Sequence, residues 1–69
     1  MRLDVLPMDA GWRVDVERCE SLMFSSGAAA EAGAHALATR LAVAGSDVQV
    51  VVHDRTFQVV GTRRYFGVH

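Results

Sequence analysis

Residues 26–45, SGAAAEAGAHALATRLAVAG, decide the fold of this chain, because they predict its one long helix. Ser26 is a typical N-cap, since its hydroxyl can accept a hydrogen bond from the backbone N–H groups of the first turn. Alanine is the strongest helix former, no proline interrupts the run, and Gly45 stands where helices commonly end. The helix is therefore expected over residues 27–44. Its inward stripe is expected to comprise Ala30, Ala34, Leu37, Ala38 and Leu41, and its outward face Glu31, His35, Thr39 and Arg40.

Three short strands are expected before this helix. Residues 2–8 are mainly apolar and end in a turn at residues 9–11. Residues 12–16 alternate apolar and charged side chains, a period of two that predicts a strand with one buried face. Trp12 is expected to pack in the principal core with Val14, Leu37 and Leu41. Residues 21–24 predict a third strand after a turn that contains Cys19.

Two further strands are expected after the helix. The Val-rich segment 47–53 predicts an interior strand, and residues 54–55 a tight turn. Residues 56–66 predict a last strand, in which Gly61 marks a bulge. The fold prediction is a single α+β domain over residues 1–69: a two-layer sandwich of an antiparallel sheet, in the element order βββαββ, with one Ala-rich helix packed on one face.

Composition limits the classes of function. The chain has 69 residues, of which 51% are hydrophobic and 22% charged, the balance of one small folded domain. Seven arginines oppose eight acids, so the net charge of -1 gives no overall attraction to nucleic acid. No cysteine or histidine spacing makes a zinc motif, and neither a secretory signal nor a membrane span is evident. A cytoplasmic protein without metal or cofactor is expected.

The strongest basic feature is the C-terminal hairpin. Arg and aromatic side chains together are the composition that grips phosphates or stacks on bases. The residues are His53, Arg55, Arg63, Arg64, Tyr65 and His69. Adjacent strand residues point to opposite faces, so Arg63 and Arg64 share a groove only if a bulge at Gly61 re-aims them. The favoured alternative is that these arginines guard an edge strand against pairing.

Other residues carry weaker signals, each with a structural alternative. An acidic group on the first hairpin could bind an Arg-rich protein surface, or could simply keep the outer face of the sheet hydrated. Its members are Asp9, Asp15, Glu17 and Glu20. The sheet face without a helix is expected to expose Val51 near the centre of a docking surface. His53 with Asp54, and Glu31 with His35, have spacings that allow catalysis, although a turn hydrogen bond and a solvated pair are the commoner uses.

Several local patterns, taken together, resemble the bacterial family catalogued as domain of unknown function 2188. They are Val5-Leu6-Pro7, Gly11-Trp12-x-Val14, Phe24 before the Ser26 cap, the helix pattern of Ala30, Ala34, Leu37 and Ala38, and Val51-Val52-His53-Asp54. The resemblance spans nearly the whole chain and implies a small α+β domain with no assigned activity. This chain departs from the family at Arg55-Thr56-Phe57, where an Asp-Gly type of turn is usual.

These observations favour a small non-enzymatic protein-binding module, such as a regulator or inhibitor that occupies a partner's surface. A phage-type anti-CRISPR inhibitor is one form of that hypothesis, and a weak homodimer is a further option. The alternative is a nucleic-acid-binding domain that uses the Arg-rich hairpin. The partner-binding residues are predicted to be Val51, His53, Arg55, Arg63, Arg64, Tyr65, Asp15 and Glu17.

Overall fold

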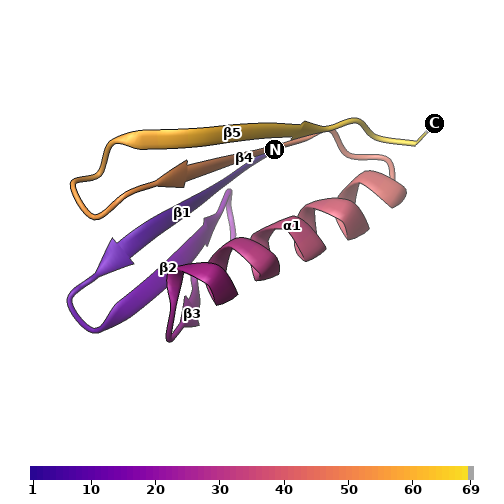
Figure 1. The fold of residues 1–69 in the computed structure, drawn as a ribbon. Coiled ribbons are helices and arrows are strands. Elements are labelled where there is room, and N and C mark those ends of the chain that lie inside the picture. Colours follow the sequence, from indigo (N-terminus) through magenta and orange to yellow (C-terminus); the bar gives the residue numbers. More distant parts are fainter. Residues whose placement is uncertain (69) are drawn as a thin grey trace.

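A computed structural model describes residues 1–68, which form one sheet and one helix (Figure 1). The element order confirms the predicted βββαββ arrangement. The elements are β1 (Arg2–Met8), β2 (Gly11–Val16), β3 (Leu22–Phe24), α1 (Gly27–Val43), β4 (Val48–His53) and β5 (Val59–Tyr65). The fold is the expected two-layer α+β sandwich, with α1 on one face of the sheet.

The sheet is mixed, whereas the sequence predicted an antiparallel one. Its strand order is β3-β2-β1-β4-β5, and β1 and β4 are parallel while the other pairs are antiparallel. The cause is the helical connection. Two hairpins leave β3 running in the direction of β1, and α1 returns the chain so that β4 also starts in that direction. A strand that joins the sheet beside β1 is then parallel to it.

Small side chains place α1 close to the sheet. Ser26 is the N-cap, and its hydroxyl accepts a hydrogen bond of 3.1 Å from the Ala29 N–H. Ala30, Ala34 and Ala38 are fully buried, which confirms that part of the predicted inward stripe, whereas Leu37 and Leu41 are only partly buried. The buried core consists of Leu3, Val5, Val14, Val16, Ala30, Ala34, Ala38, Val48 and Val50.

Trp12 lies at the edge of this core and not at its centre. It is partly buried and packs at the N-terminal end of α1, where its indole would meet a Cβ on Gly27 at 3.1 Å. Leu41 lies 14 residues further along the helix, about 21 Å away at 1.5 Å per residue. The predicted packing of Trp12 against Leu41 is therefore wrong, because the helix runs along the strands and away from that end of β2.

The connection between β4 and β5 is longer than the predicted two-residue turn. The Asp54 carboxylate accepts hydrogen bonds from the Thr56 hydroxyl, the Thr56 N–H and the Gln58 N–H at 2.6, 2.8 and 3.1 Å. Phe57 takes a φ of 63°, a conformation that favours glycine. The register then shifts between Val52 and His53, so that a bulge falls beside Gly61, as predicted.

The stability of this loop is expected to depend on pH. The hydrogen bonds from Thr56, with smaller contributions from Gln58 and His53, hold the pKa of Asp54 below its ordinary value. A carboxyl with a lowered folded pKa stabilises the fold above its unfolded pKa, and this contribution is lost as pH falls through the folded pKa. Urea unfolding should therefore show Asp54→Ala less stable than wild type at neutral pH, with the difference shrinking below the ordinary carboxyl range. A difference independent of pH would contradict this role of the carboxylate.

Candidate functional site

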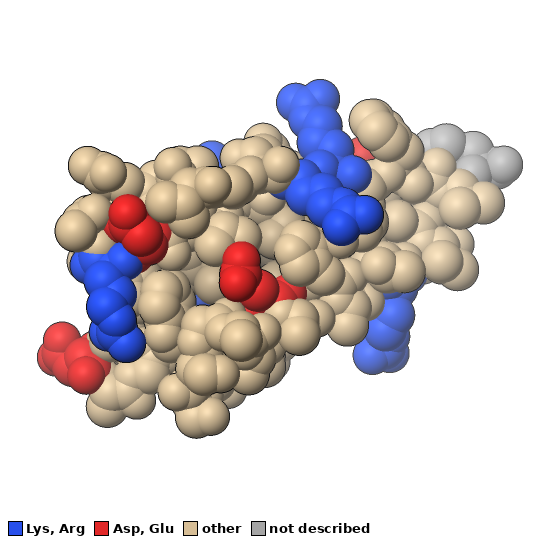
Figure 2. Space-filling view, viewed as in Figure 1, with Lys and Arg blue, Asp and Glu red and all other residues tan. Residues whose placement is uncertain are grey.

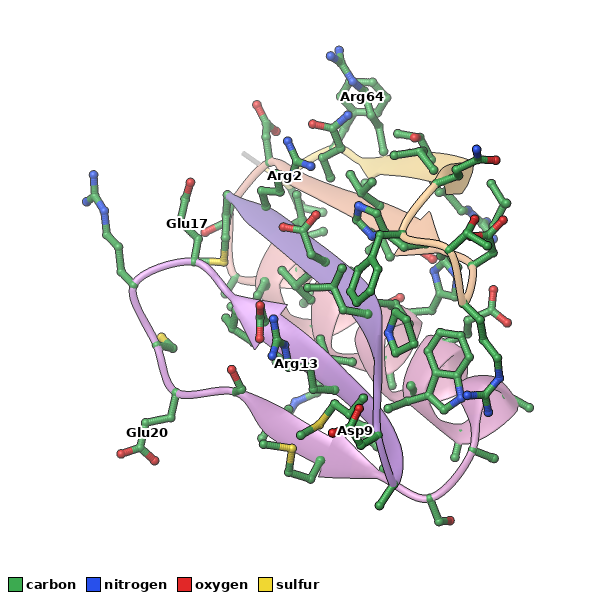
Figure 3. The ribbon with its side chains drawn as sticks, turned by 90° about the vertical axis from the view of Figure 1, so that its left-hand side faces the viewer. Arg2, Asp9, Arg13, Glu17, Glu20 and Arg64 are labelled. Atoms are coloured by element: carbon green, nitrogen blue, oxygen red, sulfur yellow. The ribbon has the colours of Figure 1, made fainter. Side chains whose placement is uncertain are left out.

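The sheet face opposite α1 is covered by charged side chains that pair with one another. The Arg2 guanidinium donates to both carboxylate oxygens of Asp4 at 2.9–3.1 Å. Arg13 Nε lies 3.1 Å from Asp15 Oδ1, which also accepts from the Ser21 hydroxyl. Figure 3 shows Arg2, Arg13 and Arg64 on this side of the sheet, with α1 behind it. On this face Arg2 and Arg13 are each paired with an acid, whereas Arg64 is not, and the face has no single sign of charge.

His53 lies on the same face of the sheet and does not pair with Asp54. Its Nδ1 lies 3.0 Å from the Val5 carbonyl oxygen, and its Nε2 lies 4.0 Å from Asp4 Oδ1. The Asp54 carboxylate instead binds its own loop. The side chain of His53 is 11% exposed. The structure therefore assigns it to the β1–β4 junction, and His53 and Asp54 are not hydrogen-bonded to each other.

The expected exposure of Val51 is wrong. Val51 is on the face without a helix but is only 4% exposed. It lies on an interior strand, between Asp4 on β1 and Thr62 on β5 in the two ladders. A partner cannot use a side chain that the sheet's own neighbours have already removed from solvent.

The acidic residues of the first hairpin do not form one patch. Asp9 lies in the β1–β2 turn, whereas Glu17 and Glu20 lie beyond the opposite end of β2 (Figure 3). Asp15 is occupied by Arg13 and Ser21. These acids are close in the sequence but apart in the structure, because the length of β2 separates Asp9 from Glu17 and Glu20.

Strand β5 is the strand that α1 covers least. It is an edge strand, and α1 packs mainly on β1, β2 and β4 and contacts β5 least (Figure 1). Val59 and Val60 are 57% and 63% exposed. Basic side chains gather over this strand at the upper edge of the molecule (Figure 2). Strand β5 is thus a seven-residue edge strand with apolar and basic side chains in solvent.

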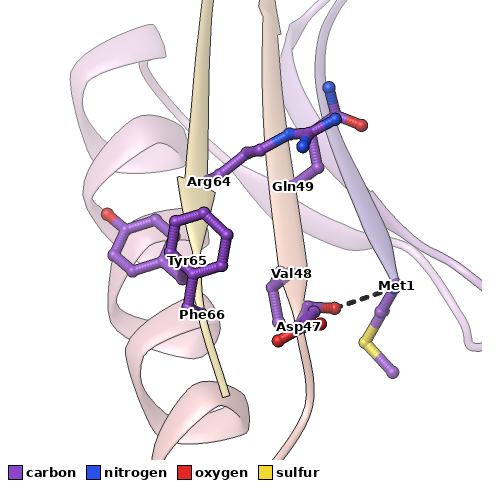
Figure 4. Close-up of a pocket in the computed structure, with 7 residues that line it drawn as sticks. All are labelled: Met1, Asp47, Val48, Gln49, Arg64, Tyr65 and Phe66. Carbon is purple, nitrogen blue, oxygen red and sulfur yellow. Dashed lines mark hydrogen bonds between the residues drawn. The ribbon is translucent and has the colours of Figure 1, made fainter.

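The two neighbouring arginines of β5 point to opposite faces. Arg64 pairs with Gln49 in the ladder and points away from α1, in the same direction as Gln49 (Figure 4). Arg63 pairs with Val50 on the helix side, where its guanidinium lies 5.1 Å from the centre of the Tyr65 ring. The bulge precedes Gly61 and leaves this alternation intact. The two arginines therefore do not line one groove.

A hollow of about 220 Å³ lies between α1 and β5. It is lined by Glu31, His35, Val50, Val52, Val60, Gly61, Thr62 and Arg63. His35 was expected to face solvent with Glu31, but it is partly buried, and its Nδ1 lies 2.6 Å from the Tyr65 hydroxyl. This hydrogen bond joins the helix to the end of β5. The hollow remains open further along, where Gly61 carries no side chain.

Substitution of Gly61 is expected to stabilise the domain. A Cβ at Gly61 would meet nothing within 4 Å, and the backbone there is outside the left-handed region. A glycine within a strand costs about 0.5–1 kcal/mol relative to alanine, and valine has a higher strand propensity. Gly61→Val should raise the free energy of unfolding in urea by about 0.5–1 kcal/mol. A loss of stability would show that the hollow is closed in solution.

Arg55 is separate from the other arginines of the hairpin. It lies in the loop after β4, with its guanidinium 5.5 Å from the centre of the Trp12 ring. Arg63 contacts a different aromatic residue, Tyr65. The basic cluster expected from the sequence is thus distributed over a loop and two faces of a strand. His69, which was grouped with it, lies outside the described residues.

Within residues 1–68, no group of three His, Cys, Asp or Glu side chains is arranged to hold a metal ion. Among the described residues, no helix combines the length and the apolar character that crossing a membrane requires. Comparisons of the chain with protein-family models, curated proteins and solved structures find no match. The candidate site therefore depends on geometry alone: the β5 surface, defined here as the outer edge of Gly61–Tyr65 with the adjoining hollow.

Sequence reasoning found Arg63, Arg64 and Tyr65 on this surface but missed the residues that shape it. The sequence indicates only a bulge at Gly61, and it places His35 on the outward face of the helix, paired with Glu31. A glycine on an uncovered edge strand also leaves space beside the helix, a signal that is present in the sequence. The contact of His35 with Tyr65 joins residues 30 apart and has no local signal.

Proposed function

We propose that this domain is a non-enzymatic protein-binding module and that the β5 surface is its binding site. The observation that carries the proposal is that β5 lies at the edge of the sheet and that most of its side chains, Thr62, Arg63 and Arg64 among them, are exposed. Edge strands that natural proteins leave unpaired are usually short, covered or bulged. Here the edge from Gly61 to Tyr65 is regular, and the bulge lies only at its start.

The surroundings of this edge support protein binding over chemistry on a small molecule. The adjoining hollow is open to solvent, and its lining mixes apolar side chains with Glu31, His35 and Arg63. Ligand pockets usually enclose most of a small molecule. A strand edge beside an open hollow instead resembles the surfaces that accept an extended peptide. A role as a regulator or inhibitor, and kinship with domain of unknown function 2188, are parts of this proposal.

Nucleic-acid binding is the second candidate, and the placement of the arginines disfavours it. Arg63 and Arg64 point to opposite faces of β5, and Arg55 lies over Trp12. A phosphate backbone follows one groove and contacts basic side chains that face the same way. Few phosphates could be neutralised at once, which implies weak binding at physiological salt.

The test is affinity capture from a lysate of the source organism, with bound protein and nucleic acid both identified. The β5 variant is Arg63→Glu, Arg64→Glu. The matched control is Arg18→Glu, Arg40→Glu, which makes the same change of charge at exposed positions outside β5. A protein that is retained by the wild type and the control, that is lost by the β5 variant, and that binds again when purified supports the proposal.

Labelled single- and double-stranded oligonucleotides provide the opposing measurement, by fluorescence anisotropy at about 150 mM salt. No appreciable binding is expected. Micromolar binding that the β5 variant loses would replace the proposal with a nucleic-acid function. Capture of a protein equally by all three chains would place the binding site elsewhere on the domain.

A further inference from the structure

We infer that the partner supplies an acidic, extended segment that adds to the outer edge of Gly61–Tyr65 as a sixth, antiparallel strand. The inference rests on the proposed function, and it specifies the chemistry of the partner. Three features of β5 carry it: a regular free edge, two unpaired positive charges, and an open space beside a glycine.

The edge of β5 has the geometry that strand addition requires. Its ladder with β4 is regular from the Val48–Tyr65 pair to the Val52–Gly61 pair. After Tyr65 the chain bends toward α1, where the Gly67 N–H donates to Asp47 Oδ1 and the Val68 N–H donates to the Ala42 carbonyl. Within residues 1–68, therefore, no strand occupies this edge, and its outward N–H and C=O groups are available to another chain.

The charges on this edge select an acidic partner. Arg63 and Arg64 are exposed, and no carboxylate among residues 1–68 lies within ion-pairing distance of either guanidinium. Residues directly opposite each other on antiparallel strands share a face, so one partner residue lies beside Arg63 and the next beside Arg64. Two consecutive acidic residues in the partner would thus meet one arginine on each face.

The same charges act against a second copy of this chain. Antiparallel pairing of two β5 strands with Arg63 of one copy opposite Arg64 of the other would place two arginines side by side on each face of the joined sheet, and residues 59–65 contain no acid. Like charges on paired strands are unfavourable. The two arginines therefore guard the edge against self-pairing and favour an acidic strand, which unites the protective and the functional interpretations of these residues.

Gly61 determines which kind of partner residue is preferred opposite it. It lies on the helix side of β5, opposite Val52, and its missing side chain leaves the hollow open. In paired strands a large cross-strand neighbour covers a glycine and fills the space beside it. The partner residue opposite Gly61 is accordingly an aromatic or large apolar one, two positions after the acid that faces Arg63.

The test uses two extended synthetic peptides with the central sequences Thr-Glu-Glu-Thr-Tyr and Thr-Lys-Lys-Thr-Tyr. Binding is followed by NMR of the isotope-labelled domain at low and physiological salt. The acidic peptide should bind about tenfold more tightly than the basic one, with shifts centred on Gly61–Tyr65, and salt should weaken it. The Arg63→Glu, Arg64→Glu variant should reverse the preference, and Gly61→Val should weaken binding while the domain stays folded.

Each outcome is decisive for the inference. Equal binding of the two peptides, shifts on another element, or an unreversed preference in the charge-reversed variant would overturn it. If the acidic peptide fails but the captured protein still depends on Arg63 and Arg64, the partner chemistry is wrong and the proposed function stands. If neither peptide binding nor protein capture depends on β5, the inference and the proposed function are both wrong.

Discussion

Val51→Glu is expected to lower the free energy of unfolding by about 3 kcal/mol or more, because it places an unpaired carboxylate at a position that is 4% exposed. A domain of this size has a total stability of about 3–10 kcal/mol. The loss is a large fraction of that stability, so the variant should unfold at a much lower urea concentration than the wild type at neutral pH, as followed by circular dichroism. Protonation of the introduced carboxyl should recover part of the loss at low pH.

Gln49→Glu is the matched control for this substitution. Gln49 is on the same strand and the same face, two residues away, but it is partly exposed and lies opposite Arg64. A carboxylate there keeps its contact with water and gains a cation across the ladder. Its stability should be close to that of the wild type. A Val51→Glu variant as stable as the wild type would show that this face opens in solution, and would restore Val51 as a candidate binding residue.

Ala34→Leu is expected to cost about 1–3 kcal/mol, because three additional side-chain carbons do not fit between α1 and the sheet. Ala34 is fully buried, and the buried helical residues Ala30, Ala38 and Ala42 are alanines as well. This run of small side chains sets the short distance between the two layers. Urea unfolding at neutral pH measures the cost directly.

The control for this overpacking is Ala36→Leu, two residues along the helix and exposed. Leucine and alanine are both good helix formers, so the stability of this variant should change little. Equal stability of the two leucine variants would contradict the close approach of α1 to the sheet. It would also contradict the view that α1 contacts β5 least because the helix packs tightly on β1, β2 and β4.

The local elements of this fold could be predicted from the sequence because each has a local cause. Ser26 and the alanine run specify the helix, and the alternation over residues 12–16 specifies β2. The parallel pairing of β1 with β4 could not be found in this way, since it depends on where the chain returns after α1. The position of Trp12 at the helix N-terminus likewise follows from how α1 lies across the strands.

The candidate site was harder to predict, because exposure depends on neighbours distant in the sequence. Val51 has the sequence signature of an open-face residue, yet its neighbours on β1 and β5 bury it. Arg63 and Arg64 were correctly placed on opposite faces by strand alternation. The hollow beside them arises from the offset of α1 relative to β5, which no local pattern encodes.

The claim that β5 is the binding surface is tested most directly by amide hydrogen exchange on the domain with and without its captured protein partner. In the free domain, the β5 amides that face β4 should be protected and those at the outer edge of Gly61–Tyr65 should exchange rapidly. On binding, these outer amides should become protected, while those of β3, the opposite edge, stay unchanged. Protection that appears on β3 or on the charged face of the sheet, with the outer edge of β5 still exchanging rapidly, would contradict the account.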